Sequence, residues 1–205
     1  MIAVIDYGAG NVRSVAKALQ AAGAPVTVTN AAADVLAADS VVLPGVGAFA
    51  DCMASLRRAG LVEAILQVVL EGRPFLGICV GMQVLFEQGE EMGLHAGLGL
   101  LPGRVVRFPG QLAARGLKVP HTGWNQIQPL LPCRLLHGLP QGAWAYFNHA
   151  YHCAARSEHT AADTEHGISF ASVVQRGSTY GVQFHPEKSQ HVGLRVLRNF
   201  VEQSQ

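Results

Sequence analysis

A cysteine stands in a turn of small residues directly after an apolar run. The segment Gly77-Ile78-Cys79-Val80-Gly81 follows Phe75 and leads into a helix-like stretch. This order of small residue, nucleophile and glycine is typical of a nucleophile elbow, a sharp strand-to-helix turn that presents its nucleophile above a sheet. The first amides of the helix would lower the pKa of the thiol, and the Val80 N–H would bind an oxyanion. The pattern indicates acyl-transfer chemistry at Cys79, with a merely buried cysteine as the alternative.

A base and a carboxylate follow the strand-like segment Thr179 to Val182. His185 and Glu187 are two residues apart, so in extended backbone their side chains point the same way. Glu187 is then expected to accept a hydrogen bond from one ring nitrogen of His185 while the other nitrogen faces a thiol. With Cys79 this predicts a catalytic triad in the chain order Cys, His, Glu. Without an elbow elsewhere in the sequence, His185 and Glu187 would indicate only a solvated turn before a helix.

Two glycine-rich loops also follow strand-like segments. Pro44-Gly45-Val46-Gly47-Ala48-Phe49 is expected at the same sheet edge as the elbow, where its backbone N–H groups would supply a second oxyanion donor. Asp6-Tyr7-Gly8-Ala9-Gly10-Asn11 resembles the start of a dinucleotide fingerprint, but Arg13 stands where the third glycine belongs. This loop therefore reads as a tight turn with an Asn cap, or as a docking loop at the carboxyl edge of the sheet.

The sequence favours neither a metal nor a cofactor. Its four cysteines lack the spacing of a zinc or redox motif, which also indicates a reduced chain. A metal site built from Cys79, His185 and Glu187 would have no evident fourth ligand. His149 and His152 lie three apart in a strand-like stretch, which puts their rings on opposite faces.

Composition limits the possible partners. The 205 residues are 49% hydrophobic and 14% charged, which suits one α/β domain spanning residues 1–205. The net charge of +1 provides no electrostatic source for nucleic-acid binding. No apolar run is long enough for a membrane span, and the amino terminus lacks the charged start of a signal peptide, so we expect a cytoplasmic protein.

Hydrophobic periodicity predicts an α/β fold. The expected strands are 2–5, 26–28, 40–43, 75–78 and 179–182, with further short strands at 104–108, 124–127, 143–147 and 171–174; the expected helices are 11–23, 61–72, 82–87 and 189–203. Pro44 is expected to stop the third strand. The alternation in the first half predicts a three-layer sandwich with a mostly parallel central sheet, to which the second half adds antiparallel or mixed strands.

Five separated motifs carry a resemblance to a known family. The elbow, the two glycine-rich loops, the His185–Glu187 segment and Val119-Pro120-His121-Thr122-Gly123-Trp124-Asn125 resemble those of class I (triad) glutamine amidotransferases, in particular the glutaminase subunits of imidazole glycerol phosphate synthases. The resemblance implies that Cys79 attacks the side-chain amide of L-glutamine, that His185 moves the protons, and that Glu187 orients the imidazole. A glutamyl thioester would form and be hydrolysed to glutamate, with no cofactor.

The resemblance also implies roles for further residues. The oxyanion donors would be the amides of Val80 and Val46, and the substrate contacts would come from Gln83, Gly45, Gly47 and His149. The ammonia would pass to a (β/α)8-barrel cyclase subunit, bound as a heterodimer, for imidazole glycerol phosphate and aminoimidazole carboxamide ribotide formation in histidine biosynthesis. The interface residues would be Asn11, His121, Trp124, Asn125 and Lys188.

The chain also departs from the family pattern. Ala150 stands where a serine is common, so one hydrogen bond to glutamine would be missing. Thr122 replaces a frequent methionine and Val80 a usual leucine, and the latter change keeps the N–H. A glutaminase of another synthase, a stand-alone cysteine hydrolase and a catalytically idle interaction subunit are the alternative interpretations.

Overall fold

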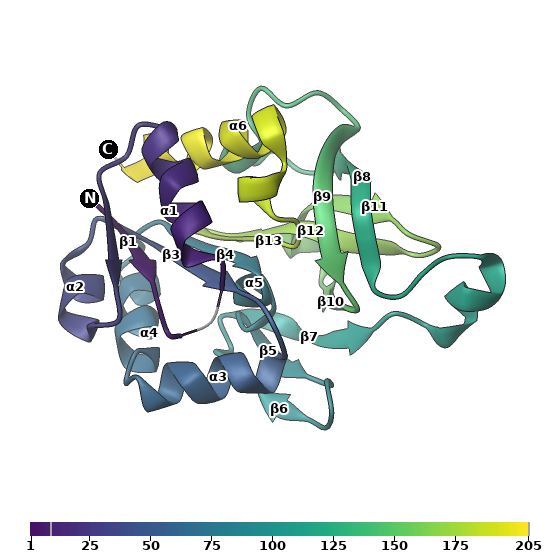
Figure 1. Ribbon diagram of the computed structural model, residues 1–205, viewed down its shortest axis with the longest axis horizontal. Coiled ribbons are helices and arrows are strands. Elements are labelled where there is room, and N and C mark those ends of the chain that lie inside the picture. Colours follow the sequence, from purple (N-terminus) through teal and green to yellow (C-terminus); the bar gives the residue numbers. More distant parts are fainter. Residues whose placement is uncertain (9, 205) are drawn as a thin grey trace.

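A mixed nine-stranded sheet forms the centre of the molecule (Figure 1). The computed structural model describes residues 1–8 and 10–204, so Ala9 of the first glycine-rich loop and Gln205 lie outside the described residues. In sheet order the strands are β2 (Val26–Thr29), β1 (Ile2–Ile5), β3 (Ser40–Gly45), β4 (Phe75–Cys79), β13 (Thr179–Val182), β12 (Ser169–Arg176), β11 (Thr160–Glu165), β8 (His121–Pro129) and β9 (Ala143–His149). The pairings from β2 to β13 are parallel and those from β13 to β9 antiparallel. The predicted α/β class is confirmed.

Helices cover both faces of the parallel half of the sheet. In Figure 1, α1 (Val12–Ala21) and α6 (Gln190–Val201) lie above it, while α2 (Ala32–Ala37), α3 (Phe49–Arg58) and α4 (Val62–Leu70) lie below. The apolar positions of α1 that the sequence predicts to face the core, Val12, Val15, Ala16 and Leu19, are all buried. Asn11 occupies the predicted N-cap position of α1, but its side chain makes no capping hydrogen bond.

A second, four-stranded sheet was not predicted. It runs β10 (Tyr151–Ala155), β7 (Leu101–Arg107), β5 (Phe86–Gly89) and β6 (His95–Ala96). The predicted helix 82–87 is wrong, because the helix after the elbow, α5 (Val80–Gln83), has a single turn and β5 follows it. The carbonyls of Val84 and Phe86 accept hydrogen bonds from the N–H groups of Leu98 and Gly99 at 2.8 and 3.2 Å, so they are not free to continue a helical ladder.

Strand β3 continues through Pro44, which contradicts the prediction that this proline ends it. Pro44 is paired with Ile78 of β4, whereas the pairing of β3 with β1 ends at Val42. The missing N–H of the proline therefore leaves no partner unpaired on the β1 side. The added length carries Gly45 level with Cys79.

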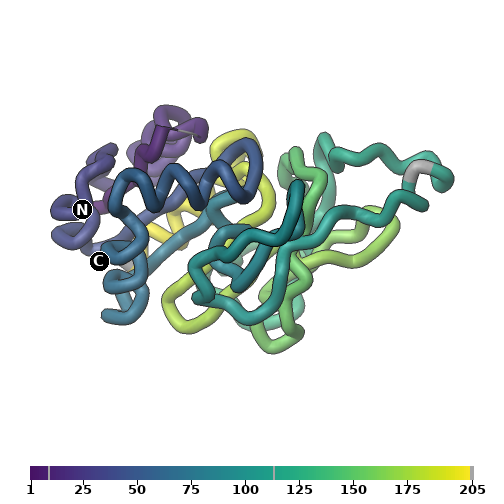
Figure 2. The backbone as a smooth tube through the Cα atoms, turned by 90° about the horizontal axis from the view of Figure 1, so that it is seen from below, coloured from purple at the N-terminus to yellow at the C-terminus, as the bar shows by residue number. Residues whose placement is uncertain are grey.

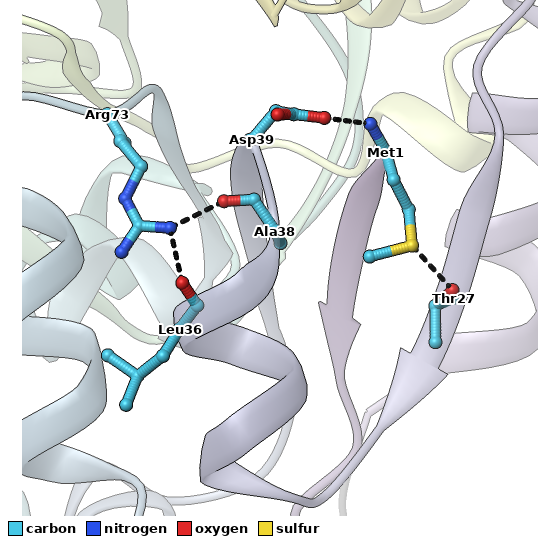
Figure 3. A network of polar contacts seen from close by, with 6 residues as sticks. All are labelled: Met1, Thr27, Leu36, Ala38, Asp39 and Arg73. Carbon is cyan, nitrogen blue, oxygen red and sulfur yellow. Dashed lines mark hydrogen bonds and ion pairs between the residues drawn. The ribbon is translucent and has the colours of Figure 1, made fainter.

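Polar contacts close the amino ends of the parallel strands, as Figure 3 shows. The amino-terminal ammonium pairs with Asp39, and the Thr27 hydroxyl donates to the Met1 sulfur at 3.2 Å. Arg73 donates to the carbonyls of Leu36 and Ala38 at 2.8 and 2.6 Å. This edge is the one opposite the elbow.

The link between β7 and β8 projects from the far end of the antiparallel half, away from the helices (Figure 2). It contains a 3-10 helix of six residues, Gly110–Arg115, whereas the other 3-10 helices in the described residues have three residues each. None of the helices in the described part of the chain is long and apolar enough to cross a membrane.

Candidate active site

The elbow at Cys79 is built by close backbone packing. Cys79 has φ 55° and ψ −111°, a conformation that non-glycine residues rarely adopt and that is found at strained functional turns. A Cβ atom on Gly81 would lie 1.9 Å from the Leu43 carbonyl oxygen, and one on Gly77 would lie 2.4 Å from the Gly81 oxygen. Only glycines at these positions let the turn fold back over the neighbouring strands.

Sheet pairing brings the predicted triad residues together. β4 and β13 are adjacent and parallel, with Ile78 opposite Val182, so both strands end at the same edge. Cys79 and His185 line the same cavity, and Cys79 lies near enough to raise the pKa of the ring. On the other side of the ring, His185 Nδ1 lies 3.0 Å from Glu187 Oε1, as the two-residue spacing predicts.

The environment of His185 favours its charged form. The residue is 4% exposed, and this burial alone would lower its pKa. The hydrogen bonds and charges of Cys79 and Glu187 outweigh burial and raise the pKa of His185 to about 9. At neutral pH the ring is therefore an imidazolium, held between a sulfur and a carboxylate.

A cavity of about 260 Å³ opens in front of the sulfur. It is lined by Val46, Gly47, Cys79, Val80, Gln83, Glu91, Pro120, Asn148, His149, Ala150, Tyr151, His185 and Lys188. The lining includes the residues expected to bind the oxyanion, Val46 and Val80, and three of those expected to bind substrate, Gln83, Gly47 and His149. The remaining predicted substrate residue, Gly45, does not line the cavity. A Cβ on Gly45 would lie 2.4 Å from the Gly81 nitrogen, so its place is explained by packing under the elbow.

Gln83 is tied to the protein through its amide nitrogen. Gln83 Nε2 donates to the Tyr151 carbonyl at 3.0 Å and to Gln183 Oε1 at 3.1 Å. Gln183 Nε2 in turn lies 3.7 Å from Cys79 Sγ. Since both N–H groups of Gln83 are used, its amide oxygen is the atom left for a ligand.

Glu91 is a site residue that sequence reasoning missed. Its carboxylate lines the cavity and accepts a hydrogen bond from the Phe49 N–H at 2.8 Å. It comes from the loop after β5, and only the unpredicted second sheet places this loop beside the elbow. The sequence signal was weak, since the acidic residue stands in an ordinary glycine-rich loop.

The predicted interface residues lie in different environments. Trp124 is 45% exposed on the outer face of β8 and touches Tyr146 edge-on, over which Lys188 Nζ lies at 5.6 Å. Asn11 and Asn125 are half-buried. His121, in contrast, is 5% exposed and packs inside, so it does not belong to the outer surface.

Neither a second hollow nor the arrangement of metal-binding residue types indicates a further functional site in the described residues. A larger hollow of about 1050 Å³ lies at the opposite edge of the sheet, beside Tyr180 and Cys133, and contains none of the candidate triad residues. Within residues 1–8 and 10–204, no cluster of three or more His, Cys, Asp or Glu side chains is arranged to hold a metal ion.

The fold and the site define a class of protein. The glutamine amidotransferase class-I family model matches residues 3–204, and the chain belongs to this family. Among its relatives is the imidazole glycerol phosphate synthase subunit HisH of Desulfitobacterium hafniense, 51% identical over 201 residues that cover 98% of this chain and 93% of the relative. The HisH subunit of Moorella thermoacetica is 52% identical over 202 residues, covering 98% and 94%.

Solved structures share the fold at low identity. A crystal structure of a glutamine amidotransferase matches with a TM-score of 0.76 at 20% identity, covering 100% of this chain and 99% of the other. The structure of PurLQS from Thermotoga maritima matches with a TM-score of 0.74 at 16% identity, covering 98% and 97%. At this identity the likeness shows the fold alone.

Proposed function

We propose that the chain is the glutamine-hydrolysing subunit of an imidazole glycerol phosphate synthase. The observation that carries the proposal is the convergence of Cys79 and the His185–Glu187 pair on one small cavity. A cavity of about 260 Å³ suits a single amino acid. The match to the glutamine amidotransferase class-I family supports glutamine as that amino acid, and the HisH relatives, about half identical over nearly the whole chain, support the synthase.

The proposed reaction has two acyl-transfer steps. The Cys79 sulfur attacks the side-chain amide carbon of glutamine, and the imidazolium of His185 gives its proton to the departing nitrogen, releasing ammonia and leaving a glutamyl thioester. A water molecule then attacks the thioester and gives a proton to His185, which releases glutamate and restores the sulfur. Glu187 orients the ring through Nδ1 and stabilises its charge.

The cavity lining supports roles for the other groups. In both steps the amides of Val80 and Val46 would bind the oxyanion. The amide oxygen of Gln83 and the carboxylate of Glu91 are acceptors, which suits the α-ammonium group of an amino acid. Gly47, with φ 86°, and His149 complete the substrate side of the cavity.

We propose that the ammonia passes to a (β/α)8-barrel cyclase subunit bound as a heterodimer. The names of the HisH relatives support a synthase partner. Trp124 is exposed on β8, and Lys188, at the cavity, lies over the Tyr146 ring of β9 that Trp124 touches, which suits a docking surface there. We also infer that residues 1–205 act as one domain in the cytoplasm, since the buried side chains form one core and the cysteines are unpaired.

Glutamine turnover by the purified chain, with and without the cyclase, tests this function. We expect little ammonia release alone and a large increase when the cyclase carries its ligand. Cys79→Ala should abolish glutamine-dependent turnover, while the complex still forms and ammonium salts still support the cyclase. The matched control Cys133→Ala changes a half-buried cysteine away from the cavity and should behave as wild type. Persistent turnover in Cys79→Ala would refute the nucleophile, and turnover without any cyclase effect would favour a stand-alone hydrolase.

A further inference from the structure

A chain of side-chain hydrogen bonds runs from the outer strand β8 to the cavity. Asn125 Nδ2 lies 3.2 Å from His121 Nε2, and His121 Nδ1 lies 3.2 Å from His149 Nε2. His149 Nδ1 then lies 2.8 Å from the Tyr151 carbonyl oxygen. Both His149 and Tyr151 line the cavity in front of Cys79, whereas His121 and Asn125 do not.

The two ends of this series of hydrogen bonds set the donor and the acceptor in every bond. At the outer end, Asn125 Oδ1 accepts from the Gln126 N–H at 2.8 Å and its amide nitrogen donates to the Glu165 carbonyl at 2.9 Å, so the remaining N–H of that nitrogen faces His121. At the inner end, a backbone carbonyl can only accept, so His149 Nδ1 must carry a hydrogen.

The donor at Asn125 and the acceptor at the Tyr151 carbonyl are both satisfied when the two imidazole rings are neutral. If His149 is protonated only on Nδ1, its Nε2 accepts, and His121 Nδ1 must donate to it. The Nε2 of His121 is then bare and accepts from Asn125. Every nitrogen in this hydrogen-bond chain thus has one role. Moving the hydrogen to the other nitrogen of either ring would set two donors against each other in one bond and two acceptors in the next.

Burial keeps both rings neutral. Desolvation lowers the pKa of His121 to about 4 and that of His149 to about 3. His166 and His152 face the pair and add to this effect, and His166 stacks on His121 with ring centres 4.1 Å apart. These hydrogen bonds therefore form a fixed line of dipoles rather than a route for protons.

We propose that His121 is a positioning residue for glutamine binding, which holds His149 and the Tyr151 carbonyl in place through this one-directional chain. The Tyr151 carbonyl also accepts from Gln83 Nε2, so one oxygen anchors two of the cavity's side chains. Losing the donor at His121 would free the His149 ring and loosen the site that Gln83 helps to form. The inference rests on the proposed function, and the tests below separate the two.

Steady-state kinetics of the chain with its cyclase give the first test. In His121→Phe the new ring keeps its place on Phe147, whose ring centre lies 4.9 Å away, but has no nitrogen. We expect KM for glutamine to rise roughly fivefold to tenfold, the loss of one buried hydrogen bond, with kcat changed much less. The matched control His166→Phe alters the same aromatic cluster, but its ring nitrogen binds only the Lys118 carbonyl, so KM should stay at the wild-type value.

A rescue variant distinguishes positioning from packing. The side-chain amide of an asparagine at position 121 can place its N–H where Nδ1 stood. His121→Asn should therefore recover part of the KM that His121→Phe loses, although it removes the aromatic ring. An unchanged KM in His121→Phe, or an equal loss in His166→Phe, would overturn the proposal. Loss of turnover in Cys79→Ala alongside an unchanged His121→Phe would leave the proposed function standing and the inference refuted.

Nitrogen NMR of the wild-type protein tests the chain without any substitution. With nitrogen-15-labelled histidine, we expect His121 and His149 each to be neutral at neutral pH, with the hydrogen on Nδ1. His121→Phe assigns the signals of His121, and His149→Phe, made for this purpose, assigns those of His149, since each removes one ring. A hydrogen on Nε2 of either ring, or a charged ring at neutral pH, would contradict the predicted direction of the bonds and overturn the inference.

Discussion

Glu187→Gln tests how the carboxylate acts on His185. In the wild type the side chain of Glu187 is 1% exposed, and its Oε1 accepts from His185 Nδ1 at 3.0 Å. A glutamine keeps the shape and can keep an oxygen at this position but removes the charge. A charge-assisted hydrogen bond is worth about 1.5–3 kcal/mol and a neutral one about 0.5–1.5 kcal/mol, so the imidazolium would lose roughly 1–1.5 kcal/mol.

This loss converts into a shift of the pH profile. Since 1.36 kcal/mol corresponds to one pKa unit, the pKa of His185 should fall from about 9 by roughly one unit. In the proposed mechanism the imidazolium gives its proton to the departing nitrogen, so the high-pH limb of kcat/KM should move down by the same amount. The charged His185 ring is present below its pKa and is lost above it. Because the variant has the lower pKa, it loses activity at a lower pH than the wild type.

The second carboxylate oxygen limits the expected loss of rate. Glu187 Oε2 is buried and has no hydrogen-bond partner among the described residues, so nothing holds the new amide with its nitrogen toward His185. The amide oxygen can therefore turn to the Nδ1 hydrogen and keep the correct tautomer. We expect a loss of about tenfold in kcat/KM below the limb, corresponding to about 1.4 kcal/mol.

Glutamate release in the presence of the cyclase, followed from about pH 6 to about pH 10, measures both effects. Thermal denaturation of the same samples shows whether the variant is folded. Glu187→Ala is the comparison, since it leaves the Nδ1 hydrogen with no acceptor and should lose more activity than the glutamine variant. An unmoved alkaline limb in Glu187→Gln would refute the electrostatic role.

Two further substitutions probe the elbow and the cavity. Gly45→Ala puts a Cβ 2.4 Å from the Gly81 nitrogen, so it should lower the free energy of unfolding by roughly 1–3 kcal/mol and Tm by several degrees. The control Gly110→Ala has open space around the added Cβ and should keep the wild-type Tm. Equal Tm values for the two variants would contradict the packing argument. Ala150→Ser adds a hydroxyl at the cavity wall. If this hydroxyl makes one neutral hydrogen bond to glutamine, KM for glutamine should fall by about twofold to tenfold. A higher KM would show that the hydroxyl faces elsewhere.

Local patterns in the sequence predicted the parallel half of the fold well. The spacing of apolar residues in α1 and the short apolar runs of β1, β3 and β4 determine these elements through nearby interactions. The same local reasoning predicted that Glu187 would reach His185, because the two residues share one extended segment.

The missed features depend on distant contacts. The segment after α5 has a helix-like pattern, but it forms β5 because the N–H groups of Gly97 and Gly99 donate to the carbonyls of Glu87 and Phe86. Helix α3 was missed even though its buried residues have helical spacing, since glycines and a proline precede it. The burial of His121 also depends on a distant contact, the pairing of β8 with β9 that sets it opposite His149.

The ladder between β4 and β13 makes the catalytic distance a property of the main chain. Ile78 and Val182 are paired, and the His185 N–H donates to the Tyr146 carbonyl at 2.9 Å, so main-chain contacts bring the sulfur and the imidazole to the same sheet edge. A one-residue slip of that ladder would turn the nucleophile to the opposite face of the sheet. Substitutions in the core that leave this ladder intact should therefore change the stability of the fold more than the distance between the two reacting groups.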